Sequence, residues 1–196
     1  MTWLQTYTGK KIDFNNVTED DICIEDIAEA LSKECRFGGH CKKFYSVAQH
    51  SYLTALIVTP DYALEALLHD ATEAYLKDIP SPLKALLPDY KAIEKRLDAV
   101  IRRKFGLPEK MSGEVKKADL VMLATERNFL LKDDGSEWPC LAGVEPHPTL
   151  KIVSLQPFWA RKLFFDFFYA LTVRDQIQTI ARNNYLKVVN DEVRGE

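Results

Sequence analysis

Two of the four histidines in this 196-residue chain stand in apolar, helix-like sequence. His50 follows "YSVAQ", and His69 is joined to Asp70 within "ALLHDATEAYL". Glu73 comes one helical turn later and is expected on the same side of the helix. Asp119 lies in "KKADLVMLATE", where a carboxylate that points inward is unfavourable without a partner. Imidazoles and carboxylates together form a mixed nitrogen and oxygen set that suits Mn, Fe, Co or Zn, and suits Ca less well.

The joint occurrence of these residues favours a metal site, because a lone helical histidine or aspartate is more often a satisfied or exposed side chain. Neighbouring residues of a helix point about 100° apart, so His69 and Asp70 would hold an ion from the two flanks of the groove between them. A metal ion with open coordination positions lowers the pKa of a bound water and makes it a nucleophile. We therefore predict a divalent transition metal at this site, with Mg as a further candidate.

The elements that must position these residues are helices, because apolar residues recur at helical spacing over most of the chain. Helices are expected over about residues 24–35, 46–58, 60–77, 89–106, 113–131 and 157–183. Ser46 and Gln49 match a capping box at the start of the second helix, and Ser112 caps the fifth. The Thr59-Pro60 pair would make the second and third helices antiparallel neighbours, which brings the two histidines toward each other.

These segments predict a single all-α domain over residues 1–196. The stretch "LQTYTGKKIDF" suits a short strand or hairpin, and residues 132–156 contain the proline and glycine breaks of a long surface loop. A chain of this length can bury one proper core and is too short for two comfortable domains.

Composition and charge argue against several classes of protein. The net charge is −3 and basic residues are spread among acidic ones, which argues against a nucleic-acid polymer as the partner. No apolar run reaches the roughly 18 residues of a membrane span, and the N-terminus lacks the pattern of a secretion signal. The four cysteines form no CxxC pair, and "CRFGGHC" lacks the second ligand pair of a structural zinc site. We therefore expect a cytoplasmic protein with reduced thiols.

The arrangement H…HD…D on successive helices resembles the HD superfamily of metal-dependent phosphohydrolases. The segments "SVAQHS" and "HDATEAYLKDIPSPLK" are similar to those of the bacterial 5′-deoxynucleotidases and of the small phage-type deoxynucleoside triphosphohydrolases, including dATP-specific ones. The resemblance covers roughly residues 24–130 and fades in the long loop and the last helix. It implies an HD-type helical bundle that cleaves nucleotides by attack of a metal-activated water on the phosphate nearest the sugar.

The resemblance also assigns roles to single residues. The metal ligands of the family match His50, His69, Asp70 and Asp119. Glu73 matches the acidic residue that handles the attacking water or the leaving group, and Asp78 matches a nearby carboxylate that positions the site.

The candidates for substrate binding are Arg36, Phe37, Lys84 and Lys116. The segment "CRFGGH" lies where such enzymes place an arginine and an aromatic residue against the nucleotide, and the two lysines lie where cations would bind phosphate. Each also has a structural alternative: solvated lysines, an arginine at the end of its own helix, and a phenylalanine in the core. His40 and Tyr45 could face either toward the site or away from it.

Two functions stay open from the sequence. The first is a nucleotide phosphohydrolase that acts on a monophosphate or a triphosphate; a cyclic-nucleotide phosphodiesterase usually needs more histidines for a binuclear centre. The second is an HD-fold module that has lost catalysis and senses a nucleotide or a partner. Loss of catalysis should erode the ligand set first, and here the ligands and Glu73 are all present.

The last predicted helix contains "KLFFDFFYAL", which places aromatic side chains around more than one of its faces: Phe164, Phe165, Phe167, Phe168 and Tyr169. A helix on the outside of a small domain needs a single apolar stripe. The surplus is buried either by the domain core or by a symmetric contact between subunits. Relatives of this type form dimers or larger rings, which the resemblance implies here. We predict a homo-oligomer with this helix at or near the contact.

Overall fold

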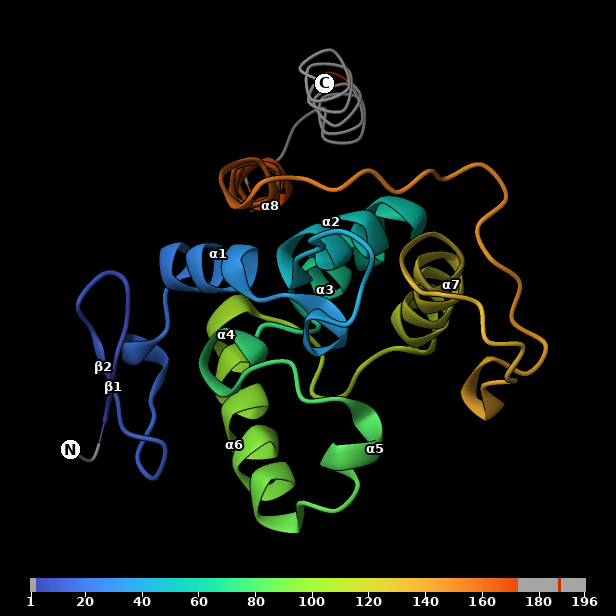
Figure 1. Cartoon of the computed structure of the whole chain (residues 1–196). Helices are drawn as coiled ribbons and strands as arrows, with labels where there is room; N and C mark the ends of the chain where they lie inside the picture. The colour runs from blue at the N-terminus through green and yellow to red at the C-terminus, as the bar shows by residue number, and fades with distance from the viewer. Residues whose placement is uncertain (1–2, 173–186, 188–196) are drawn as a thin grey trace.

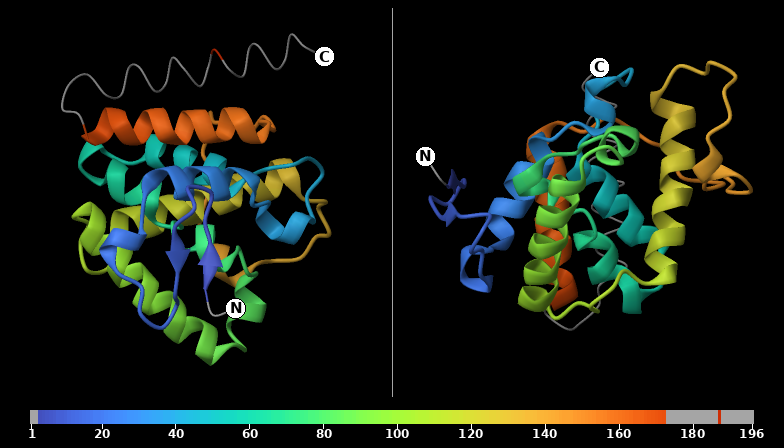
Figure 2. Two further views of the ribbon diagram at one scale, coloured as in Figure 1. Left: turned by 90° about the vertical axis from the view of Figure 1, so that its left-hand side faces the viewer. Right: turned by 90° about the horizontal axis from the view of Figure 1, so that it is seen from below.

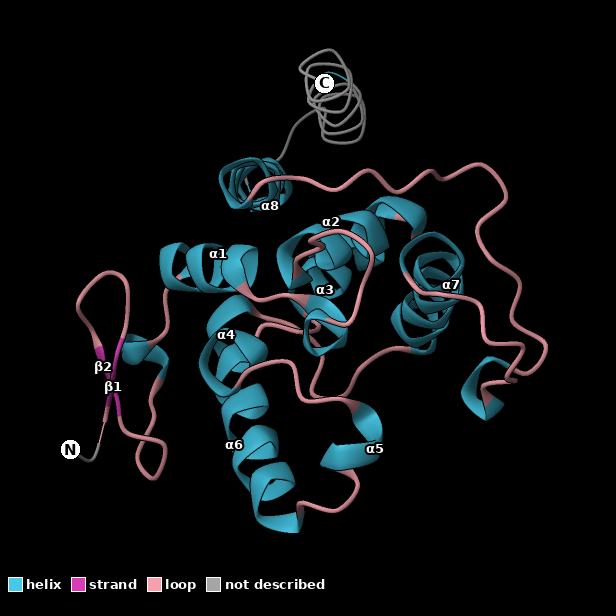
Figure 3. Ribbon diagram, in the orientation of Figure 1, coloured by secondary structure: helices cyan, strands magenta, loops and turns pink. Residues whose placement is uncertain are grey.

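The computed structural model describes residues 3–172 and residue 187. The chain folds mostly into helices, as the sequence predicts, with a small hairpin near the N-terminus (Figure 1, Figure 3). Strand β1 (Leu4–Gln5) pairs antiparallel with β2 (Lys11–Ile12), and Leu4 lies opposite Ile12. The hairpin falls within the stretch predicted to form one.

The helices are α1 (Ile24–Lys33), α2 (Val47–Ile57), α3 (Ala63–Leu68), α4 (Glu73–Leu76), α5 (Ser81–Lys84), α6 (Pro88–Phe105), α7 (Gly113–Leu130) and α8 (Pro157–Thr172). Helices α2 and α7 begin at the predicted caps, since the Ser46 hydroxyl accepts a hydrogen bond from the Gln49 N–H and the Ser112 hydroxyl accepts one from Val115. None of the described helices is both long and apolar enough to cross a membrane. Residues 173–183 of the last predicted helix lie outside the described residues.

The helix predicted over residues 60–77 is interrupted. Helix α3 ends at Leu68, and α4 begins only at Glu73. The His69 ring donates from Nδ1 to the Ala66 carbonyl oxygen at 2.7 Å, and this is the oxygen that the N–H of residue 70 would bind in a continuous helix. The interruption places His69 and Asp70 in a turn in which the N–H of Ala71 bonds the Leu68 carbonyl oxygen and that of Glu73 bonds the Asp70 carbonyl oxygen.

Helix α2 lies at the centre of the fold. Its residues from Val47 to Ala55 are all buried, and it packs against α1, α3, α7 and α8. Helix α8 lies over α1 and α2, and α7 lies beside α2 (Figure 1, Figure 2). The predicted loop between α7 and α8 contains a short 3₁₀ turn, Pro139–Leu141, and is anchored to α2 by the Gln49 side chain.

The core takes most of the aromatic surface of α8. Phe164, Phe167 and Phe168 are buried among the core residues of their own chain. The aromatic residues that stay exposed on this helix include Phe158 and Tyr169, whose exposed fractions are 62 % and 44 %. The surplus of aromatic side chains is therefore smaller than the sequence pattern indicates.

Candidate metal centre

Side chains from α2, from the turn after α3 and from α7 converge in the middle of the molecule. His50 Nε2 lies 3.2 Å from His69 Nε2 and 3.2 Å from Asp119 Oδ1, and His69 Nε2 lies 3.7 Å from the same oxygen. The Oδ2 atom of Asp70 is 3.5 Å from His50 Nε2 and 3.3 Å from His69 Nε2. The structure thus brings together the residues predicted as metal ligands.

These spacings are compatible with ligands that surround one ion. Nitrogen and oxygen ligands lie about 2.0 to 2.2 Å from a transition metal, which places neighbouring ligand atoms roughly 3 to 3.6 Å apart. The ligand atoms of His50, His69 and Asp119 all lie within 4.8 Å of one another and could hold a metal ion. Their donor types fit a divalent transition metal, and Asp70 is close enough to join them.

Each imidazole is held through its other ring nitrogen. His69 Nδ1 donates to the Ala66 carbonyl oxygen at 2.7 Å, and His50 Nδ1 lies 2.5 Å from Oε1 of Glu126. An acceptor at Nδ1 places the ring proton on that nitrogen and leaves Nε2 available for a metal. Both histidines therefore present the correct nitrogen to the centre.

The electrostatics of the centre favour a positive charge within it. Burial lowers the pKa of His50, but Glu126 and Asp119 outweigh burial and raise this pKa to about 10. Burial also lowers the pKa of His69, but the net shift is upward because Asp70 and Asp119 attract its proton. Burial raises the pKa of Asp119, whereas hydrogen bonds from the two histidines hold it well below its usual range. A divalent ion would supply the charge that these carboxylates stabilise.

The turn after α1 brings Arg36 to the centre. Its Nε donates to Glu126 Oε2 at 3.1 Å, and its Nη1 lies 3.4 Å from Asp70 Oδ2. The centroid of the Phe37 ring lies 5.5 Å from the guanidinium carbon of Arg36. The Phe37 side chain is partly buried and packs against the core. In this structure Arg36 therefore bonds carboxylates of the site, and Phe37 lies near the guanidinium and packs against the core.

A cavity of about 360 Å³ opens beside the metal ligands, and its lining includes His69, Asp70, Glu73 and Lys84. Glu73 is only 6 % exposed, and among the described residues its Oε2 has no hydrogen-bond partner. Burial, together with the charges of Asp70 and Asp78, raises the pKa of Glu73 well above its usual value. A buried carboxyl with a raised pKa beside a metal site is suited to proton transfer.

Asp78 and Lys84 both lie near this carboxyl. Burial raises the pKa of the partly buried Asp78, and its charge contributes to the raised pKa of Glu73. Lys84 lines the cavity and forms an ion pair with Glu94 at 2.7 Å. The structure therefore brings both residues close to Glu73, and their roles as a positioning carboxylate and a phosphate-binding cation stay predictions.

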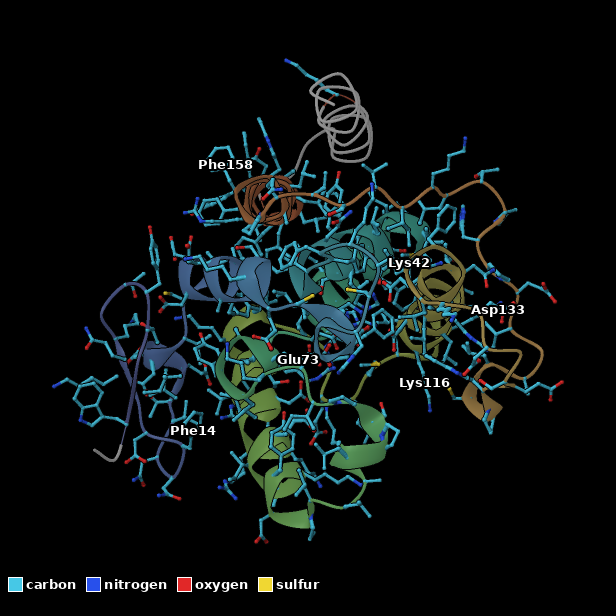
Figure 4. The ribbon with its side chains drawn as sticks, viewed as in Figure 1. Phe14, Lys42, Glu73, Lys116, Asp133 and Phe158 are labelled. Atoms are coloured by element: carbon cyan, nitrogen blue, oxygen red, sulfur yellow. The ribbon has the colours of Figure 1, made fainter. Side chains whose placement is uncertain are left out.

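Lys116 is not brought into the cavity. Lys116 is exposed and is absent from the lining of the described cavity. Figure 4 shows it near the start of α7, whereas Glu73 lies near the middle of the molecule. Val115, its neighbour, takes the buried position of this turn, and the next residue of a helix points about 100° away. Phosphate binding by Lys116 stays a prediction. Of the two residues left open, His40 is exposed and Tyr45 is buried in the core.

Glu126 is a site residue that the sequence patterns did not single out. Its position was visible in the sequence, since it follows Asp119 by two helical turns (126 − 119 = 7) and stands on the same face of α7. Burial raises the pKa of Glu126, but the charges of Arg36 and His50 outweigh burial and hold it below its usual value. The signal that could have identified Glu126 in the sequence was therefore an acidic residue two helical turns after a predicted metal ligand.

No family model matches the chain. It is 51 % identical over 172 residues to the uncharacterized protein YfdR of Escherichia coli (strain K12), in an alignment that covers 88 % of this chain and 97 % of that protein. The chain belongs to the YfdR family. It is also 35 % identical over 126 residues to the uncharacterized protein RCAP_rcc00048 of Rhodobacter capsulatus, which covers 59 % of this chain and 64 % of that protein. Neither name states an activity, so the function of this YfdR-family protein is argued from its site.

Proposed function

We propose that this protein is a metal-dependent phosphohydrolase that cleaves nucleotides, as the HD superfamily that its sequence resembles does. The supporting observation is a ligand group with a proton-transfer candidate beside it. His50, His69 and Asp119 could hold an ion, and Glu73 has a buried oxygen that no described residue bonds. Attack of water on phosphorus requires both charge stabilisation and a group that handles the proton.

A divalent ion at this position would supply Lewis acidity, which lowers the pKa of a bound water and offsets the charge of a phosphate. Glu73 would take a proton from the attacking water at Oε2, or return one to the leaving oxygen. Lys84 would exchange its bond with Glu94 for a phosphate oxygen. Arg36 would keep Asp70 oriented toward the centre. The bond broken joins phosphorus to the sugar oxygen, in a nucleoside monophosphate or triphosphate.

Formation of deoxynucleoside and of phosphate or polyphosphate from a panel of nucleoside mono-, di- and triphosphates, with and without Co²⁺ or Mn²⁺, tests the proposal. We expect metal-dependent formation of a deoxynucleoside together with phosphate or tripolyphosphate. Glu73→Gln keeps the ligand set and should bind metal without turnover. Binding of nucleotides by the metal-loaded wild type without any hydrolysis would instead identify a catalytically inactive sensing module.

We also propose that the protein assembles into a homo-oligomer, a dimer or a larger ring, with α8 at or near the contact. The aromatic side chains available for the contact include Phe158 and Tyr169, which stay exposed. Light scattering across a wide concentration range should show a multiple of the 22.4 kDa chain mass. A strict monomer over that range would contradict the proposal.

A further inference from the structure

Glu126 on α7 is a fully buried carboxylate with a nitrogen partner on each of its oxygens. Oε1 lies 2.5 Å from Nδ1 of His50, and Oε2 accepts a hydrogen bond from Nε of Arg36 at 3.1 Å. A buried carboxylate is unfavourable unless such partners are present. Glu126 does not line the described cavity beside Glu73, so the proposed reaction gives it no proton to move.

The first of these bonds decides which nitrogen of His50 can bind a metal. An ionised carboxylate only accepts hydrogen bonds, so the ring proton lies on Nδ1. Nε2 is then the nitrogen that an ion can bind in place of a proton, and it lies 3.2 Å from both His69 Nε2 and Asp119 Oδ1. Without the carboxylate, the ring could rotate or take the other tautomer, and either change removes Nε2 from the ligand set.

The second bond connects Glu126 to another ligand. Arg36 reaches Glu126 through Nε and reaches Asp70 Oδ2 through Nη1, at 3.4 Å. Arg36 stands in the turn Arg36–Gly39, where Phe37 has a left-handed φ of 58° that surrounding contacts must hold. One carboxylate on α7 thus contacts a histidine ligand on α2 and, through the guanidinium, an aspartate ligand after α3.

We propose that Glu126 is a positioning residue of this metal centre, which acts on the ligands through His50 and Arg36 and touches neither the ion nor the substrate. The inference rests on the metal site of the proposed function and is independent of which nucleotide is cleaved. A buried ion pair with a purely structural role would change the stability of the fold and leave metal affinity unchanged. The two roles are therefore separated by the metal affinity of a folded variant and by the state of the His50 ring.

Glu126→Gln keeps the shape of the side chain and removes its charge, and Glu114→Gln is the matched control at an exposed position of α7. Zinc affinity, measured by competition with a chelating dye, should weaken about 10- to 100-fold in Glu126→Gln and stay unchanged in Glu114→Gln. Circular dichroism establishes that each variant is folded. An unchanged zinc affinity in folded Glu126→Gln would overturn the proposal.

Nitrogen-15 NMR of the zinc-loaded wild-type protein gives a second measurement, which does not require the variant to fold. Two-bond proton–nitrogen correlations should show His50 with its proton on Nδ1 and zinc on Nε2. Zinc on Nδ1, or a proton on Nε2, would overturn the proposal, and a wild type that binds no zinc would overturn both proposals. Neither experiment uses a substrate, so a protein that binds zinc as expected but forms no deoxynucleoside from any nucleotide contradicts the proposed function alone.

Discussion

The two sides of the candidate site differ in how completely their polar atoms are bonded. On the side of α2 and α7, His50 and Glu126 are fully buried and bond each other, and Arg36 adds a further bond. On the cavity side, Glu73 is also buried, but one of its oxygens has no partner among the described residues. Lys84 lies there beside open space of about 360 Å³.

This difference separates two tasks. A side chain whose polar atoms have hydrogen-bond partners keeps a fixed geometry, and a fixed geometry suits the binding of an ion. A buried polar atom without a partner is unfavourable, and a reacting water or a substrate oxygen would satisfy it. We therefore propose that the α2–α7 side fixes the metal ligands, and that the cavity, which His69 and Asp70 also line, is the place of turnover.

The largest effect is expected on the cavity side, for Glu73→Gln. This variant should lose about two to four orders of magnitude in kcat, the range typical of general acid–base groups, and should keep the metal affinity of the wild type. The matched control is Glu109→Gln, at an exposed position that does not line the described cavity. Steady-state phosphate release and a metal titration on the same samples provide the measurement. If Glu73→Gln lost its metal, the division between the two sides would fail.

A pH effect of intermediate size is expected on the α2–α7 side. The pKa of His50 is raised from 6.5 to about 10, so between these pH values the folded, metal-free protein binds more protons than the unfolded chain. The stability from this group is complete below about pH 6.5 and is lost as the pH rises through about 10, at up to ~1.4 kcal/mol per pH unit. Urea unfolding of the metal-free protein from pH 6 to pH 10 measures the slope.

Two comparisons sharpen this pH experiment. His50→Gln should make the slope shallower, because one titrating group is gone, and His69, whose pKa is also raised, accounts for part of what remains. Bound metal should also reduce it, because the ion takes the place of the proton. A wild-type, metal-free protein whose unfolding free energy does not fall over this pH range would contradict the electrostatics described for the centre.

The smallest effect separates the two predicted phosphate-binding lysines. Lys84→Ala should raise KM about tenfold, since a hydrogen bond to a charged group contributes roughly 1.5 to 3 kcal/mol and part of this is offset by the lost pairing with Glu94. Lys116→Ala should change KM less than twofold if its exposed position persists when substrate binds. Michaelis–Menten kinetics of both variants decide the point. A larger effect from Lys116→Ala would extend the substrate site along α7.

Residue type and helical spacing were sufficient to predict most of the helices and three residues that the fold brings together as possible metal ligands. His50, His69 and Asp119 stand out because polar residues within buried helices conflict with the apolar pattern around them. The caps at Ser46 and Ser112 are local signals, and both helices begin there. Features that depend on residues close together in the sequence, such as helix caps and polar positions in apolar helices, were therefore predictable.

The features that the sequence did not reveal depend on tertiary contacts. The break after α3 involves the bond from the His69 ring to a backbone carbonyl, which competes with helix formation. The left-handed backbone of Phe37 is rare for any residue other than glycine, and no local pattern predicts it. Glu126 resembles an ordinary helical glutamate until its burial against His50 is known.

We propose that His50, His69, Asp70 and Asp119 bind a single divalent ion. Titration of the metal-free protein with Co²⁺, followed by visible absorption, tests it most directly because the spectrum reports both stoichiometry and ligand geometry. We expect saturation at one equivalent per chain in the wild type and loss of tight binding in His69→Ala. Full binding with an unchanged spectrum in His69→Ala, or no binding in the wild type, would contradict it.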